Sequence, residues 1–370
     1  MTALRVAVAG LGNAAVNLHL PALASIPHAR LVGGCDPTEA TRLAAGRQFA
    51  FPVFATLAEL LRSTSPDVVI VCAPPTAHKA ICLEALAAGT HVLCEKPLAT
   101  SVAEAEEILA AAARAGKRLA LNHEFREMPA FRALLDAARD DAGGVVFAQA
   151  WQNMDLPPWA EPGWRGQLLN GVLYEAGIHL VDFVVAAFAE TPRAVSATMS
   201  SCGTRDEQTD AVALVTLEFS RGRLAQVIQN RLCKGETQYF EVRVDTASAS
   251  HRVSYGGRAR VSLGLLRSRK PHVRLEMGGA GMAWRERGHD RETLAGNPGN
   301  APMIATRNLI DRTLRAFIDG TPAPASGEEG RDVLKVLAAA YLSARDGRRV
   351  ATDEAVVESY QFEHGTPARG

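Results

Sequence analysis

The sequence predicts a two-domain α/β protein: a doubly wound parallel sheet in residues 1–122, then an α+β domain with a large, mainly antiparallel sheet in residues 123–350. Strand and helix signals alternate through the first domain, and a glycine turn joins its first strand to its first helix. After about residue 122, strands follow one another without obligatory helices. A chain of 370 residues is also too long for one compact core. Residues 351–370 are predicted to form a polar tail that is disordered or packs against a partner.

In the first domain, short apolar strands alternate with helices long enough to cross back over the sheet. The continuous apolar run at residues 66–74 is typical of a strand buried on both faces. Such units are right-handed βαβ crossovers, which build a parallel sheet. The predicted strands are residues 4–10, 29–36, 51–54, 66–74, 90–97 and 117–123, and the predicted helices are 14–26, 37–49, 56–63, 76–89 and 101–116.

The second domain combines a run of strands with closing helices. A turn at residues 220–222 predicts a hairpin between two of the strands. The predicted strands are residues 143–152, 193–201, 210–220, 222–230 and 238–245, and the closing helices are 302–319 and 328–345.

The composition argues against several classes of function. Lys and Arg together number 40, as do Asp and Glu, so no net charge draws the chain to nucleic acid or an anionic membrane. No apolar run approaches the roughly 18 residues that cross a bilayer, and the N-terminus does not resemble a signal peptide. The six cysteines lack metal-ligand spacing. We therefore expect a cytoplasmic protein without a metal site, whose partner is a small molecule.

A GxGxxA sequence begins at Gly10, directly after the first strand, and predicts a Rossmann-type dinucleotide site. Gly12 lets the backbone approach a pyrophosphate, which would rest on the free N–H groups of Asn13 and Ala14 at the helix start. Asp36 ends the second strand, where a carboxylate binds the adenosine ribose hydroxyls and repels a 2′-phosphate. The sequence therefore favours NAD over NADP.

The sequence Glu95-Lys96-Pro97 after the fifth strand resembles the EKP signature of the Gfo/Idh/MocA family, the relatives of glucose–fructose oxidoreductase and inositol dehydrogenase. A second signature of that family, D-x-G-x-H, resembles the segment from Glu175 to His179, with glutamate in place of aspartate. The resemblance covers nearly the whole chain. It implies a cleft between the domains in which Glu95 and Lys96 meet the cofactor and Lys96 also contacts the substrate oxygen.

The chemistry of these side chains is consistent with that resemblance. Oxidation of an alcohol needs a base that takes the hydroxyl proton as the C–H bond breaks. We expect His179 to be this acid/base, with Lys96 donating to the substrate oxygen or sharing the proton. Glu175 would bind a substrate hydroxyl or hold His179, because positions four apart on an α-helix share one face.

Further residues are candidates for cofactor or substrate contacts. Thr76 and His78 follow the fourth strand and are expected to line the nicotinamide ribose, although His78 is equally suited to capping or to the surface. The candidate substrate contacts are Arg126, Trp151, Trp164, Arg165 and Glu175. A salt bridge between domains is the alternative for Arg126, and core packing is the alternative for each tryptophan.

These observations predict an NAD(P)-dependent oxidoreductase that acts on a sugar, cyclitol or related polyol, or on a keto-sugar. The substrate class is implied by the resemblance alone. One alternative is a glycoside hydrolase that uses bound NAD transiently, and another is a non-catalytic protein that senses NAD. Because the outer face of the second sheet needs cover, we also expect a homodimer or homotetramer formed through that sheet.

Overall fold

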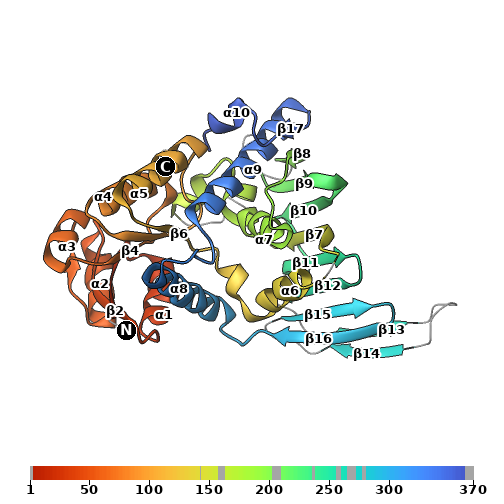
Figure 1. The fold of residues 1–370 in the computed structure, drawn as a ribbon, viewed down its shortest axis with the longest axis horizontal. Coiled ribbons are helices and arrows are strands. Elements are labelled where there is room, and N and C mark those ends of the chain that lie inside the picture. Colours follow the sequence, from red (N-terminus) through yellow and green to blue (C-terminus); the bar gives the residue numbers. More distant parts are fainter. Residues whose placement is uncertain are drawn as a thin grey trace.

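The computed structural model describes residues 3–141, 143–156, 163–201, 210–235, 238–255, 260–264, 272–276 and 281–362. A six-stranded sheet and a nine-stranded sheet lie on opposite sides of the molecule, with helices between them (Figure 1). A separate two-stranded ribbon joins β13 (Arg260–Gly264) to β14 (His272–Glu276). The predicted fold class is confirmed.

All six strands of the first sheet run parallel, in the order β3-β2-β1-β4-β5-β6. This order places β1 and β4 side by side at the centre, which is the doubly wound arrangement. The strands are β1 (Leu4–Ala9), β2 (Ala29–Cys35), β3 (Val53–Phe54), β4 (Val68–Val71), β5 (His91–Cys94) and β6 (Leu119–Leu121). The helices of this part are η1 (Ala15–His19), α1 (Leu20–Leu23), α2 (Glu39–Phe49), α3 (Leu57–Thr64), α4 (Pro75–Ala87) and α5 (Val102–Ala115).

One face of the first sheet is completed by a helix from the far end of the chain. Helix α8 (Ala301–Asp319) packs on η1 and α1, as Figure 1 shows. Its buried residues join one core cluster with those of β1 and β4; they are Leu309, Ile310, Leu314 and Phe317. The predicted boundary at residue 122 therefore misplaces α8, because the apolar face that α8 covers belongs to the first sheet.

The second sheet has the order β16-β15-β12-β11-β7-β10-β9-β8-β17. Its pairs are antiparallel except β7 with β10, which run parallel. The strands are β7 (Val145–Asn153), β8 (Ala194–Ser200), β9 (Val212–Glu218), β10 (Leu224–Asn230), β11 (Gln238–Thr246), β12 (Ser250–Tyr255), β15 (Met282–Arg287), β16 (Asp290–Gly296) and β17 (Val350–Ala351). The predicted hairpin is confirmed, since η6 (Ser220–Gly222) joins the antiparallel strands β9 and β10.

Helices fill the space between the sheets. Helix α7 (Ile178–Phe188) packs on β7, while α9 (Gly327–Asp346) contacts both α5 of the first domain and β8 of the second sheet. Helix α6 (Pro129–Arg139) covers β12, β15 and β16. The segment after β6 forms the 3-10 turn η2 (Glu124–Glu127), which joins the two parts of the chain.

The predicted tail is part of the fold as far as residue 362. Strand β17 pairs with β8, and α10 (Ala355–Glu358) follows it. Phe362 is buried, stacks on Tyr174, and donates its backbone N–H to the carbonyl of Thr100. The expectation of a disordered or partner-bound tail is wrong for residues 351–362, because apolar side chains here pack on this same chain. Residues 363–370 lie outside the described residues.

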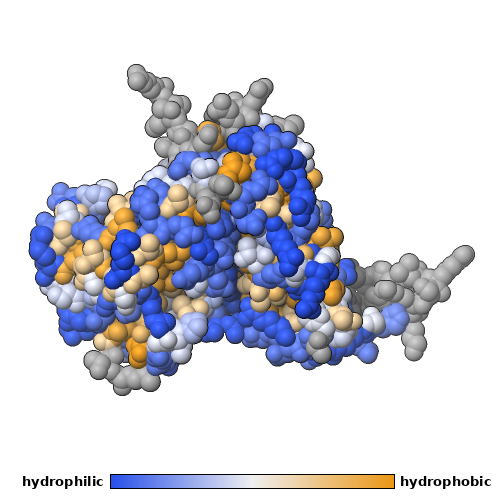
Figure 2. Space-filling model, turned by 45° about the horizontal axis from the view of Figure 1, so that its top comes forward, coloured by the Kyte–Doolittle hydropathy of each residue, from blue (hydrophilic) through white to orange (hydrophobic). Residues whose placement is uncertain are grey.

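The face drawn in Figure 2 is largely hydrophilic, with hydrophobic residues in separate patches. Among the described helices, none combines the length and the hydropathy that a membrane crossing requires.

Candidate functional site

A cavity of about 120 Å³ lies where the end of β5 meets the second domain. Lys96 comes from the first domain, and the other residues of the lining come from the second domain. The lining residues are Lys96, Gln152, Met154, Leu156, Glu175, Ala176, His179, Arg231 and Tyr239. The structure therefore brings the three predicted catalytic residues together.

Lys96 reaches across the junction of the domains. It follows β5, and the peptide bond to Pro97 is cis. Its Nζ donates to the backbone carbonyl of Glu175 at 2.8 Å and lies 3.5 Å from the Glu175 Oε1. The ammonium group is thereby fixed at the wall of the cavity by the helix that also carries His179.

A buried polar cluster supports the turn beneath Lys96. The Oε1 of Glu95 lies 2.6 Å from the Nε2 of His19 and accepts from Asn122 at 2.8 Å, while its Oε2 accepts the Lys96 backbone N–H at 3.1 Å. Burial works to lower the pKa of His19, but Cys72 and Glu95 outweigh it and hold that pKa well above its usual value. The carboxylate of Glu95 is thus bound by residues of its own chain and holds the backbone N–H of Lys96.

Glu175 is surrounded by cations. Its Oε1 accepts a hydrogen bond from the Nε of Arg165 at 2.9 Å, in addition to its approach to Lys96. Burial works to raise the pKa of Glu175, but the charges of Lys96, Arg165 and Arg231 outweigh it and bring the pKa to about 2. The carboxylate is therefore ionised throughout the neutral range and anchors Lys96.

His179 remains neutral in this environment. It is 9% exposed, its ring lies against Phe125, and its Nδ1 has no hydrogen-bond partner in the described structure. Burial lowers the pKa of His179 well below its usual value, and Lys96 and His123 act in the same direction. A neutral imidazole has one ring nitrogen free to accept a proton. This is the state that a general base requires.

The segment that carries Glu175 is not an α-helix. Residues Val172–Gly177 form a π-helical turn, η5, and α7 begins at Ile178. The predicted α-helical spacing of Glu175 and His179 is therefore wrong in its geometry, although both residues line the cavity. No hydrogen bond between their side chains occurs in the described structure, so Glu175 does not hold His179. Single π-turns inside helices are frequent at functional sites.

Two buried side chains fix the start of this π-turn. Asp210 accepts the Val172 backbone N–H at 2.9 Å and the Tyr341 hydroxyl at 2.6 Å. The Tyr341 hydroxyl also lies 2.6 Å from the carbonyl of Asn170 and accepts the Leu173 N–H at 3.2 Å. The bonds to Val172 and Leu173 satisfy backbone N–H groups of the first turn, which have no partner within the helix.

The glycine turn fits a bound dinucleotide. Gly10 has a φ of +90°, and a Cβ there would lie 2.7 Å from the backbone of Cys72 and Ala73. A Cβ at Gly12 would meet no atom of the described chain within 4 Å. Gly10 is thus needed for the close approach of β1 and β4, whereas Gly12 keeps open the space that a pyrophosphate would occupy.

The remaining predicted cofactor groups lie at the same edge of the sheet. Asn13 and Ala14 begin the helix after the turn and are accessible. Asp36 follows β2; its Oδ2 accepts the Leu11 N–H at 3.0 Å and its Oδ1 accepts the Thr38 N–H at 2.8 Å. The carboxylate is partly exposed and keeps lone pairs for ribose hydroxyls.

Thr76 and His78 have different environments. Thr76 is exposed at the start of α4. His78 is fully buried, and its ring bridges the carbonyls of Ala73 at 2.7 Å and Pro97 at 2.8 Å. The predicted contact of His78 with the nicotinamide ribose and the alternative of a surface position are both wrong, because the ring ties the loop after β4 to the turn of Lys96.

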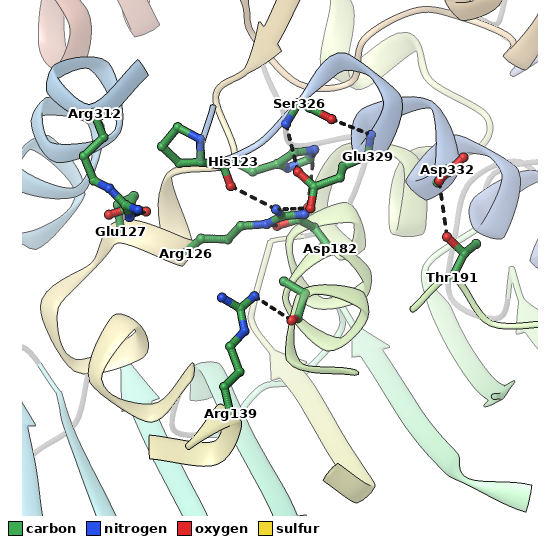
Figure 3. A network of polar contacts seen from close by, with 12 residues as sticks. His123, Arg126, Glu127, Arg139, Asp182, Thr191, Arg312, Ser326, Glu329 and Asp332 are labelled. Atoms are coloured by element: carbon green, nitrogen blue, oxygen red, sulfur yellow. Dashed lines mark hydrogen bonds and ion pairs between the residues drawn. The ribbon is translucent and has the colours of Figure 1, made fainter. Parts of the chain in front are cut away.

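Arg126 is an ion-pair residue between segments. It is 4% exposed, and its guanidinium makes two hydrogen bonds to Asp182 on α7 at 2.6 and 2.9 Å. Figure 3 shows the same guanidinium directed toward Glu329 on α9, at 3.0 Å. The predicted substrate contact is wrong, because the charge of Arg126 is already matched by the two carboxylates. Both ion pairs lie within residues 123–350, so they are not the predicted salt bridge between domains.

The aromatic candidates lie outside the cavity lining. Trp151 precedes Gln152 on β7, and alternation along the strand places its side chain on the opposite face of the sheet from the cavity. Trp164, in η4 (Gly163–Gln167), packs at the edge of the core with the Arg165 guanidinium 4.7 Å from its ring. Arg165 lies outside the lining as well and reaches the site through its hydrogen bond to Glu175, which does line the cavity.

Several residues of the cavity lining are not predicted from the sequence. Gln152, Arg231 and Tyr239 lie within or beside strands of the second sheet, and no motif marks them. Arg231 is 2% exposed and donates from its Nε to the carbonyl of Leu156 at 2.8 Å. The one available signal is a polar residue at an inward position of an alternating strand. In the described parts of the chain, no group of three or more His, Cys, Asp or Glu residues is arranged to hold a metal ion.

Known proteins resemble the chain in both domains. Residues 4–123 match the oxidoreductase family with an NAD-binding Rossmann fold, and residues 131–250 match the GFO/IDH/MocA C-terminal domain. D-apiose dehydrogenase of Paraburkholderia graminis is 27% identical over 345 residues, which cover 90% of this chain and 85% of that protein. D-glucoside 3-dehydrogenase of Escherichia coli is 27% identical over 369 residues, which cover 94% and 97%.

A solved structure confirms the fold over nearly the whole length. An oxidoreductase from Agrobacterium radiobacter, in complex with NAD+, L-tartaric acid and magnesium, superposes with a TM-score of 0.81 at 18% identity, over 95% of this chain and 99% of that one. The two matched domains follow one another in the chain in the same order as the two sheets. The chain belongs to the Gfo/Idh/MocA family of oxidoreductases, and its first domain is the NAD-binding Rossmann domain of that family.

Proposed function

We propose that this oxidoreductase is an NAD-dependent dehydrogenase or reductase that acts on a CH–OH group of a sugar, cyclitol or related polyol, with Lys96 and His179 handling the proton. The observation that carries the proposal is that Lys96, Glu175 and His179 line one cavity at the junction of the two domains. The names of the relatives, an apiose dehydrogenase and a glucoside dehydrogenase, support a sugar as substrate.

His179 and Lys96 have different roles at the reacting oxygen. NAD, when bound along the glycine turn, supplies the acceptor for the hydrogen that leaves the carbon with its electron pair. His179, neutral and with a ring nitrogen free, takes the hydroxyl proton in the direction of oxidation and returns it in the direction of reduction. Lys96 donates a hydrogen bond to the same oxygen and stabilises its developing negative charge.

Glu175 serves this arrangement as a positioning residue. The ionised carboxylate and its backbone carbonyl hold Lys96 in place, and Arg165 holds the carboxylate. The expected role of Glu175 as a direct contact of a substrate hydroxyl remains compatible with its place in the cavity lining.

The test is a panel of polyols and keto-sugars with NAD and NADP, followed at the nicotinamide absorbance, with Lys96→Met as the inactive variant. Lys96→Met removes the ammonium group and keeps a side chain of similar length. We expect turnover to fall by at least about 10²-fold, as for loss of a positioned electrostatic donor, while NAD binding by fluorescence titration is unchanged. Lys79→Met, at an exposed ion pair on α4, is the matched control.

Several outcomes would contradict the proposal. Activity of Lys96→Met close to that of the wild type would remove Lys96 from the mechanism. Release of an aglycone from glycosides without accumulation of NADH would indicate the hydrolase instead. NAD binding without turnover or binding of any polyol would indicate the sensor.

A further inference from the structure

Two glutamines lie on the inner face of the second sheet at the edge of the cavity. Gln152 on β7 is 2% exposed and lines the cavity, and Gln229 on β10 is fully buried. The two residues are register partners on adjacent parallel strands. Over the ranges that the structure describes, neither the Oε1 of Gln152 nor either amide atom of Gln229 has a hydrogen-bond partner.

These unmade hydrogen bonds are unusual. Most buried polar side-chain atoms are partnered, and one that is not costs the free energy of its desolvation. The inner faces of both strands are otherwise apolar up to this point, with Ala148 and Ala150 on β7 and Ala225 and Val227 on β10. Polar groups thus replace apolar ones where the sheet reaches the cavity. Apolar residues there would serve folding better.

The same strands contain an internal comparison. Gln149 and Gln226 are also register partners, but they lie on the outer face of the sheet. There the Nε2 of Gln149 donates to the Oε1 of Gln226 at 3.1 Å. A glutamine pair at this register can therefore satisfy itself. The inner pair, Gln152 and Gln229, makes no such bond, so the unpartnered amide atoms remain able to bind another group.

We propose that Gln152 is a substrate-binding residue whose amide binds a hydroxyl of a polyhydroxylated substrate. This rests on the proposed function. Because Gln152 shares its cavity with Lys96 and His179, the hydroxyl that it binds belongs to the molecule that carries the reacting alcohol. An amide both donates and accepts, as a hydroxyl does, so the pair matches without any charge.

The experiment compares Gln152→Met with the matched control Gln149→Met. Methionine has nearly the length of glutamine but no strong hydrogen-bonding group. For the best polyol of the panel, we expect Gln152→Met to lower kcat/KM about tenfold or more, which corresponds to one hydrogen bond. The same variant should keep or raise the Tm, since an unpartnered amide is replaced by an apolar group. Gln149→Met should keep kcat/KM.

Deoxy analogues of the substrate locate the hydroxyl. For the analogue that lacks the hydroxyl bound by Gln152, the wild type and Gln152→Met should have the same kcat/KM, while the other analogues keep the difference. This double-variant comparison isolates the pairwise interaction.

Three results would overturn the inference: unchanged kcat/KM in Gln152→Met, an equal loss for every analogue, or an activity loss that follows a lowered Tm. If Gln152→Met does not fold, Gln152→Asn replaces it. Asparagine keeps the amide but is one methylene shorter, so we expect the same loss of kcat/KM and the same dependence on the analogue. Calorimetric titration of the NAD-loaded protein with the polyol distinguishes a failure of the inference about Gln152 from a failure of the proposed function. In the latter case the wild type itself neither binds nor oxidises any polyol, and both proposals are overturned.

Discussion

The contacts of Glu175 in the structure differ from those that its place in the sequence predicts. Its position predicts a carboxylate that binds a substrate hydroxyl or orients His179. In the structure its Oε1 contacts Arg165 and Lys96 and not His179, while the side chain also lines the cavity. The additional methylene of glutamate relative to aspartate carries the carboxylate farther from the helix. The histidine is consequently left to its own burial, which keeps it neutral.

Asp210 predicts a pH dependence of stability. Burial raises the pKa of Asp210 to about 7, so the folded protein holds a proton that the unfolded chain releases near the ordinary aspartate pKa of 3.8. This contribution to stability is complete below about pH 4 and is lost as the pH rises through about 7. The free energy of unfolding of the wild type, relative to Asp210→Asn, should therefore fall between pH 4 and 7, by at most about 1.4 kcal/mol per pH unit.

Urea unfolding at several pH values measures this difference. Asp353→Asn, which removes the carboxylate of an exposed aspartate after β17, is the control for the substitution itself. A difference between the wild type and Asp210→Asn that is constant from pH 4 to 7 would contradict the prediction. It would mean that the Tyr341 hydroxyl and the Val172 N–H keep Asp210 ionised in the folded state.

Among the elements, the glycine turn separates a structural role from a binding role. Gly12→Ala adds a methyl group to open space, so we expect the Tm to stay within about 2 °C, as for a surface substitution. NAD binding should weaken about tenfold or more, because the methyl group occupies the place of the pyrophosphate. In Gly10→Ala, by contrast, the added methyl group would clash with the backbone of Cys72 and Ala73. This variant should therefore have a lower Tm even without cofactor.

Thermal unfolding without cofactor, followed by NAD titration, distinguishes the two variants. Equal NAD affinity of Gly12→Ala and the wild type would place the pyrophosphate elsewhere. A Gly10→Ala variant as stable as the wild type would show that β1 and β4 can separate at this turn.

The elements also show the limits of local patterns. The closing helices predicted at 302–319 and 328–345 agree closely with α8 and α9, because their apolar periodicity and glycine C-caps are local signals. The π-helical turns η1 and η5 have no such signal. The start of η5 is held by Asp210 and Tyr341, which bind its first backbone N–H groups and are distant in sequence.

For the whole molecule, we propose a dimer or tetramer formed through the outer face of the second sheet. Large hydrophobic residues are exposed on it, among them Leu214 at 47% and Leu224 at 43%. Light scattering of the wild type should give at least a dimer, and Leu214→Lys should shift the population toward monomer. Leu43→Lys, at 40% exposure on α2, is the matched control and should keep the oligomer.

A monomeric wild type at micromolar concentration would contradict this proposal. Equal masses for the wild type and Leu214→Lys in an oligomeric protein would place the interface on another surface. The substitution changes one exposed side chain in a strand whose inner face is unaltered, so a lower mass with an unchanged Tm reports association alone.

The sequence by itself determined the two sheets, the dinucleotide turn, the cofactor and the positions of Lys96 and His179. These depend on local periodicity and on motifs whose residue types follow from backbone and phosphate chemistry. Only the tertiary structure decided that α8 covers the first sheet, that Arg126 and His78 are structural, and that Gln152 and Arg231 line the cavity. Such contacts join segments far apart in the chain, and the free energy that selects them comes from packing and from the pairing of buried charges, which no local pattern contains.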